Sequence, residues 1–174
     1  MKSISHKLAT AVLTAFAFAG VALAADAQRQ AEVARLGADV MPFSLKDTTH
    51  IFTKTKDGGT QRVIANKPSD VQQVALIREH LRNIRQQFLT GDFPGPTHIH
   101  GADMPGLQAL KAAAPGQIKI QYNDVNAGAE LTFRSADKKL VSALHDWFDA
   151  QLSDHGSDAR AGHMHHDNDG MTTQ

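Results

Sequence analysis

Residues 50–64 read His-Ile-Phe-Thr-Lys-Thr-Lys-Asp-Gly-Gly-Thr-Gln-Arg-Val-Ile. Both ends of this stretch are rich in β-branched and aromatic residues, which favour strands. Asp57-Gly58-Gly59 lies between them and is typical of a tight turn. The stretch therefore predicts a β-hairpin.

A second hairpin is expected over residues 117–134. Ile118, Ile120 and Tyr122 alternate with polar residues, which predicts a strand with one buried face. Asn126-Ala127-Gly128 then forms a turn, and Glu130 to Arg134 alternates back. Two such hairpins predict an antiparallel sheet.

Two main helices are expected to cover this sheet. One begins at Pro68-Ser69-Asp70 and ends near Gly91, with apolar residues every three or four positions. The other begins at Ser135 or Asp137 and ends at Gly156. A shorter helix is expected over 107–114, and the Pro-rich segment 92–105 is expected to be a loop. The predicted fold is α+β, in the order ββααββα.

The first 24 residues have the pattern of a signal peptide. Lys2 and Lys7 precede an apolar run from Leu8 to Leu23, and Ala22-Leu23-Ala24 fits a cleavage site. We expect cleavage near Ala24, export to the periplasm and no membrane span after cleavage. The alternative is an uncleaved membrane anchor.

The rest of the chain divides into three parts. Residues 25–42 are expected to be a flexible or helical lead-in, 43–156 a single domain, and 157–174 a disordered tail rich in His and Met. The 18 basic and 18 acidic residues give no basic excess, so nucleic acid is not an expected partner. The chain has no cysteine, which excludes disulfides and thiolate metal ligands.

Ten histidines are the main chemical feature of the chain, since neutral imidazole is the commonest protein metal ligand. In an extended loop, His98 and His100 would point to the same side and could share a metal ion. Met104, close by in sequence, could add a thioether. The alternative is that these imidazoles satisfy backbone groups of the loop.

Four further histidines are placed singly. His50 begins the first hairpin and becomes a third ligand if its strand lies beside the loop. His80 flanks the apolar stripe of its helix, where a half-buried histidine bonded to a loop is the alternative. His145 lies at the edge of the last helix's stripe. His155 ends that helix, where a protonated imidazole would stabilise the negative end of the helix dipole.

The C-terminal tail carries a His- and Met-rich tract. Its residues His163, Met164, His165 and His166 have no core to join. Short tracts of this kind bind divalent metals, and mixed His and Met ligands favour copper over zinc or nickel. A solvated tail without a metal is the alternative.

Four blocks of the chain carry a family resemblance: Thr49-His50-Ile51-Phe52-Thr53-Lys54-Thr55-x-x-Gly58-Gly59, Leu76-Ile77-Arg78-Glu79-His80-Leu81, Gly91-Asp92-Phe93 with Ile99-His100-Gly101-x-Asp103-Met104-Pro105-Gly106, and Leu144-His145-x-Trp147-Phe148-Asp149-Ala150-Gln151-Leu152-x-Asp154-His155-Gly156. Over residues 43–156 the chain resembles a family of small exported bacterial proteins that often carry the label aspartate carbamoyltransferase. The true carbamoyltransferases have a Ser-Thr-Arg-Thr-Arg phosphate loop, which this chain lacks. The resemblance therefore implies no carbamoyltransferase activity, but it places His50, His80, His100, His145 and His155 inside the shared blocks.

The sequence thus favours a periplasmic metal-binding protein that sequesters copper or hands it on, with an envelope metal-handling protein as the expected partner. An enzyme that uses His80, His100 and His145 as acid–base groups is the first alternative. A metal-free binding module of the envelope is the second. None of the common hydrolase, phosphate-loop or zinc-protease motifs occurs in the sequence.

Overall fold

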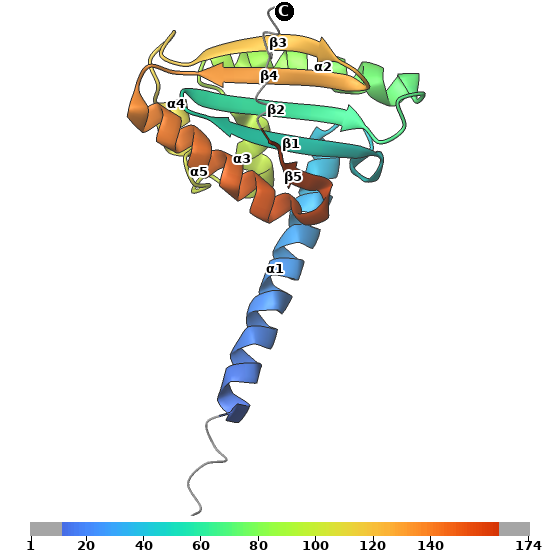
Figure 1. The fold of residues 1–174 in the computed structure, drawn as a ribbon, viewed down its shortest axis with the longest axis vertical. Coiled ribbons are helices and arrows are strands. Elements are labelled where there is room, and N and C mark those ends of the chain that lie inside the picture. The colour runs from blue at the N-terminus through green and yellow to red at the C-terminus, as the bar shows by residue number, and fades with distance from the viewer. Residues whose placement is uncertain (1–11, 164–174) are drawn as a thin grey trace, which may run out of the picture.

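The computed structural model describes residues 12–163, with side chains from residue 26 onward, and has the α+β fold expected (Figure 1). The elements are α1 (Val12–Val40), β1 (Thr48–Thr55), β2 (Gly58–Ala65), α2 (Val71–Leu89), α3 (Pro94–His100), α4 (Leu107–Lys111), β3 (Lys119–Val125), β4 (Gly128–Arg134), α5 (Lys138–His155) and β5 (Ala159–Ala161). Short 3-10 turns, Leu45–Asp47 and Gly156–Asp158, precede β1 and β5.

The five strands form one sheet in the order β3-β4-β2-β1-β5. Both expected hairpins are present, and Thr55 lies opposite Gly58 across the first turn. Gly58 has a φ of 151°, and a β-carbon there would collide with the carbonyl oxygen of Phe133 on β4. Glycine is therefore needed where the first hairpin meets the second.

One face of the sheet is buried by the helices. Thr48, His50 and Phe52 alternate inward along β1, while the residues between them stay partly exposed. On this face α2 contacts β3 and β4, and α5 contacts β1 and β2. An aromatic cluster fills the space between α5 and the sheet. Its members are Trp147 and Phe148 of α5, Phe52 of β1 and Phe133 of β4. Each such buried ring stabilises the fold by about 1.5–3 kcal/mol.

The two main helices follow their sequence signals. The Asp70 side chain caps α2 by accepting a hydrogen bond from the backbone N–H of Gln73, 3.1 Å away. Ile77, Leu81, Ile84 and Phe88 form its buried stripe. Asp137, rather than Ser135, accepts from the backbone amide of the first turn of α5, and α5 ends at His155 before Gly156 as expected.

Two expectations about irregular segments are wrong. The segment expected to be a loop contains α3, which begins at Pro94; the fixed φ of proline suits the first turn of a helix. The segment after Gly156, expected to be disordered, contains β5, which pairs with β1 in parallel. Ala-Arg-Ala has little strand propensity, so this strand depends on its pairing with β1.

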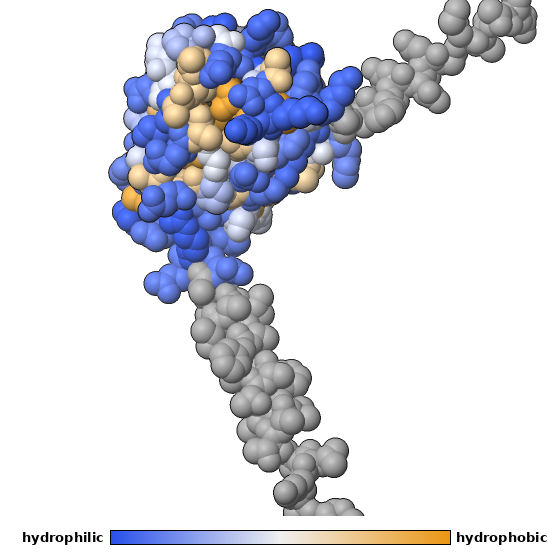
Figure 2. Space-filling model, turned by 90° about the vertical axis from the view of Figure 1, so that its left-hand side faces the viewer, coloured by the Kyte–Doolittle hydropathy of each residue, from blue (hydrophilic) through white to orange (hydrophobic). Residues whose placement is uncertain are grey.

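Helix α1 leaves the domain as a long projection, and its C-terminal part lies against α3 and α5 (Figure 1). Val33 of this helix is completely buried. Within residues 12–163, none of the helices has both the length and the apolar character needed to cross a bilayer. The face drawn in Figure 2 is largely hydrophilic. Among the residues that the structure describes, Val71 is the only large hydrophobic residue that is exposed.

Candidate functional site

Four histidines from four different elements line one small cavity between the sheet and the helices. His50 points inward from β1, and His80 lies on α2 beside the buried stripe. His100 and His155 are the last residues of α3 and α5. His50, His100 and His155 are all buried, whereas His80 is partly exposed.

The rings lie close enough to contact one another. The His50 and His155 rings are stacked, with centroids 5.4 Å apart and planes 10° apart. The His100 ring meets His155 edge-on at 5.1 Å. The Phe43 ring lies near both His50 and His80, with centroid distances of 6.0 and 5.5 Å. The topology thus brings together His50, His80 and His100, which are distant in sequence, and adds His155.

The cavity is small, with a volume of about 30 Å³. Since one water needs roughly 10–15 Å³ of such space, the cavity holds about two or three waters or a single ion. Besides the four histidines it is lined by Val40, Met41, Gln61, Val63, Leu81, Ile84, Phe88, Gly95, Pro96, Ile99, Trp147 and Gln151.

Unpartnered polar atoms surround this space. Among the described residues, the buried side-chain atoms without a hydrogen-bond partner are His50 Nδ1, His155 Nδ1, Gln61 Oε1 and Trp147 Nε1. All four belong to residues that line the cavity. An unsatisfied buried polar atom costs about 1–3 kcal/mol, so this concentration calls for a bound ion or water.

The imidazoles are held in their neutral form. Burial lowers the pKa of His50 to about 4, with His80 adding to the effect. Burial also lowers the pKa of His80 to about 4 and that of His155 to about 3. It lowers the pKa of His100 as well, although Asp154 opposes that shift. Neutral imidazole is the form that binds metal ions.

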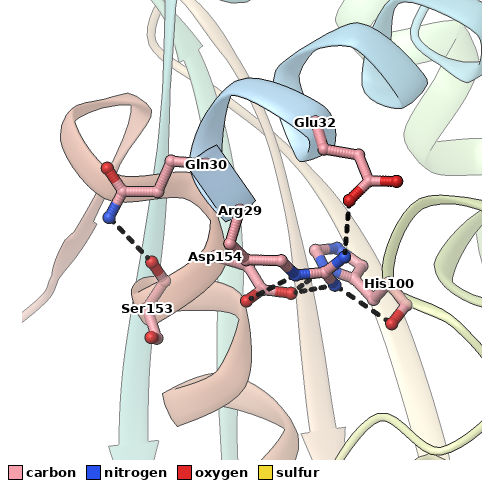
Figure 3. Close-up of polar contacts among 6 residues, drawn as sticks. All are labelled: Arg29, Gln30, Glu32, His100, Ser153 and Asp154. Carbon is pink, nitrogen blue, oxygen red and sulfur yellow. Dashed lines mark hydrogen bonds and ion pairs between the residues drawn. The ribbon is translucent and has the colours of Figure 1, made fainter. Parts of the chain in front are cut away.

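A chain of polar contacts connects His100 to α1 (Figure 3). His100 Nδ1 lies 2.7 Å from Asp154 Oδ2, and Arg29 Nη2 lies 2.7 Å from the same oxygen. Arg29 Nη2 also donates to the backbone carbonyl of His100 at 3.0 Å. Burial alone would raise the pKa of Asp154, but hydrogen bonds from Arg29 and His100 outweigh it and hold the pKa below its usual value.

The side chains are not arranged around a common point. Across residues 12–163, no group of three or more His, Asp or Glu side chains is placed so that it could hold a metal ion. Any metal site here would therefore need ring rotations that turn nitrogen atoms toward one position. The observed state is a set of neighbouring imidazoles, of which His50 and His155 each have an unpartnered Nδ1 atom.

The structure separates His98 from His100, against the expectation that they share one side. In a helix, residues two apart point in nearly opposite directions. The His98 side chain is 49% exposed and lies 3.3 Å from Asp39 of α1, whereas the His100 side chain is 1% exposed. The expectation is wrong because the segment is helical rather than extended.

Other predicted site residues lie outside the cavity lining. His145 Nε2 lies 3.0 and 2.9 Å from the carbonyl oxygens of Thr55 and Gly58, so it supports the turn of the first hairpin. Met104 is buried and lines a separate surface groove. His163 is exposed beside β5. Met164, His165 and His166 lie outside the described residues.

His155 is not the protonated helix cap that its position suggests. Its burial lowers its pKa, so the ring is neutral at pH 7 and lies in the cavity. The sequence reading also missed Met41, Gln61, Trp147 and Gln151 as lining residues, and Arg29 and Asp154 as partners of His100. The pairing of β5 with β1 and the packing of α1 carry no local sequence signal.

Comparisons with protein-family models, with curated proteins and with solved structures returned no match to this chain. The geometry of the histidine cavity is therefore the basis for a functional conclusion.

Proposed function

We propose that this protein binds a transition-metal ion, with copper favoured over zinc and nickel, through the histidines of the cavity. His50, His100 and His155 are the proposed ligands, and His80 is a candidate fourth. The proposal is carried by one observation: within the described part of the chain, every buried side-chain polar atom without a hydrogen-bond partner belongs to a residue that lines this cavity. A metal ion would satisfy the ring nitrogens of His50 and His155.

The ring separations are consistent with a shared ion. Imidazoles that bind one ion through nitrogens at ~2.0–2.1 Å have ring centres roughly 5 Å apart. The separations of 5.4 Å between His50 and His155 and 5.1 Å between His100 and His155 are close to this. Rotation about the side-chain bonds would then complete the site without moving the backbone.

Met41 favours copper among the candidate metals. It follows α1 directly and lines the cavity with the histidines. Thioether sulfur prefers Cu(I), whereas imidazole also suits Cu(II), zinc and nickel. A site with both donor types available would retain copper in either oxidation state. A protein that sequesters copper in the periplasm, or passes it on, requires this property.

An acid–base enzyme is the second candidate, because the contact between His100 and Asp154 is also typical of a general base. Its cavity, however, is about 30 Å³, which is far below the ~300 Å³ of the smallest usual ligand pockets. His145, the third proposed acid–base group, lies at the hairpin turn instead. The cavity therefore favours ion binding over acid–base catalysis.

Metal titration tests the proposal, using protein in which His163, His165 and His166 are replaced by Ala so that the tail does not compete. One equivalent of copper is expected to bind with sub-micromolar affinity. His100→Gln should weaken binding at least tenfold. His98→Gln is the matched control, because this exposed histidine lies on the same short helix. No binding tighter than micromolar, or equal effects of the two variants, would contradict the proposal.

A further inference from the structure

His100 lies in the wall between two spaces. It lines the histidine cavity, and it also lines a surface groove together with Arg29 and Asp154. Its Nδ1 atom is directed to Asp154 on the groove side. His100 also makes a side-chain hydrogen bond with Gln151, another residue of the cavity lining, and Nε2, at the opposite edge of the ring, is the nitrogen that Asp154 does not engage.

The contact with Asp154 dictates which ring nitrogen carries the proton. An ionised carboxylate accepts hydrogen bonds and donates none, so a neutral His100 at 2.7 Å from it must carry its proton on Nδ1. The lone pair of the ring is then on Nε2, where it can accept a hydrogen bond or bind a metal ion. A neighbouring carboxylate fixes the tautomer of metal-binding histidines in the same way.

Arg29 in turn holds the carboxylate. Its guanidinium contacts both oxygens of Asp154, with Nη2 at 2.7 Å from Oδ2 and Nε at 3.3 Å from Oδ1. The same Nη2 donates to the backbone carbonyl of His100. One side chain of α1 thus fixes both the backbone of the histidine and the carboxylate bonded to its ring (Figure 3).

We infer that Asp154 and Arg29 are positioning residues for His100: Asp154 keeps its ring proton on Nδ1 and so leaves the lone pair on Nε2, and Arg29 keeps Asp154 in place. This inference rests on the proposed function for its role in metal binding. The proton position itself is a property of the metal-free protein. Helix α1 is therefore part of the site although it contributes none of the proposed histidine ligands.

A structural alternative is that Arg29 and Asp154 only fasten α1 to α5. The adjacent residue Gln30 makes a contact of that kind, donating from Nε2 to the carbonyl oxygen of Ser153 at 3.1 Å. It joins the same two helices without touching His100. Gln30→Ala is therefore the matched control for helix fastening.

The test begins with the metal-free, ¹⁵N-labelled protein. A long-range ¹H–¹⁵N NMR spectrum distinguishes a protonated ring nitrogen from a bare one. We expect the proton of His100 on Nδ1 in the wild type, the Arg29→Gln variant and the Gln30→Ala variant. In Asp154→Asn the amide group can donate to Nδ1, so the Nε2-protonated form should appear. A wild-type proton on Nε2 would overturn the inference.

Copper affinity is measured next on the same four proteins with the tail histidines replaced. Asp154→Asn should weaken binding 10–100-fold, the range usual for loss of a carboxylate behind a ligand histidine. Arg29→Gln should weaken it less, by up to about tenfold, and Gln30→Ala should leave it unchanged. Folded Asp154→Asn protein with wild-type affinity would overturn the positioning role.

The two readouts separate this inference from the proposed function. A wild type that has the proton on Nδ1, loses this preference in Asp154→Asn and binds no copper supports the inference about His100 and overturns the metal proposal. If Asp154→Asn fails to fold, the wild-type NMR spectrum and the copper affinity of the Arg29→Gln variant still test the inference. In that case, an Arg29→Gln variant that binds copper as tightly as the wild type would contradict the positioning role.

Discussion

The imidazoles of His50 and His155 lie stacked face to face, 5.4 Å apart and nearly parallel, although one comes from the first strand and the other from the end of the last long helix. The Nδ1 atom of each ring is buried without a hydrogen-bond partner. Two adjacent buried rings that each leave one nitrogen without a partner are unfavourable for stability alone. Their retention is explained if an ion or water binds between the sheet and α5.

The stacked pair predicts a metal-dependent gain in stability. A ligand that binds only the folded state stabilises it by about 2.7 kcal/mol at a concentration 100 times its Kd. Copper should therefore raise the midpoint of thermal unfolding of the tail-substituted protein by several degrees. In the His50→Gln, His155→Gln double variant this increase should disappear. A wild-type midpoint that copper leaves unchanged argues against a metal in the cavity.

The lowered pKa values predict acid sensitivity of the metal-free protein. His50 and His155 have pKa values of about 4 and about 3 when folded, against about 6.5 when unfolded. The unfolded state therefore binds protons first as the pH falls below about 6.5. The free energy of unfolding should decrease by up to ~1.4 kcal/mol per pH unit for each histidine between pH 6.5 and 4.

Urea unfolding at pH 7, 5.5 and 4.5, with a chelator present, measures this slope. The His50→Gln, His155→Gln double variant should show a clearly shallower pH dependence than the wild type. His98→Gln is the control and should keep the wild-type slope, because His98 is exposed. Equal slopes in all three proteins would show that the buried rings do not control acid stability.

Met41 should determine selectivity for Cu(I). Met41→Leu removes the thioether while keeping an apolar side chain of similar size at the cavity. We expect Cu(I) affinity to fall about tenfold, equivalent to ~1.4 kcal/mol. Zn(II) affinity should stay within about twofold. Met104→Leu, at a buried methionine outside the cavity lining, is the control and should change neither affinity; an equal loss in both variants would contradict a ligand role for Met41.

His145 should contribute to the stability of the fold and not to the affinity for metal. Its Nε2 lies within hydrogen-bond distance of the Thr55 and Gly58 carbonyls at the first hairpin turn. Losing these contacts in His145→Ala should lower the free energy of unfolding by about 1–3 kcal/mol. Copper affinity of the folded variant should match that of the wild type. A large loss of affinity without loss of stability would place His145 in the metal site instead.

The sequence predicted the parts of the fold that depend on local pattern. Alternation over residues 118–122 and helical spacing over 74–88 both identified the elements found. His98 and His100 show where this reasoning fails. Two residues apart, they share a side only in extended structure, and the proline at the start of α3 allowed a helix instead.

No local sequence pattern predicted which residues would meet at the cavity. His155 enters the cavity because α5 packs against β1, β2 and β5, and Met41 enters it because α1 packs on α3 and α5. Arg29 lies in the segment that the sequence predicted only as a flexible or helical lead-in, and nothing near it in sequence indicated a contact with Asp154. Such relationships arise from tertiary packing, which periodicity does not encode.

Anomalous diffraction at the copper absorption edge, on crystals of the tail-substituted protein grown with one equivalent of copper, tests the central claim most directly. We expect one strong peak between the rings of His50, His100 and His155, about 2 Å from a nitrogen of each. A peak confined to exposed histidines such as His98, or a cavity containing only water, would contradict it.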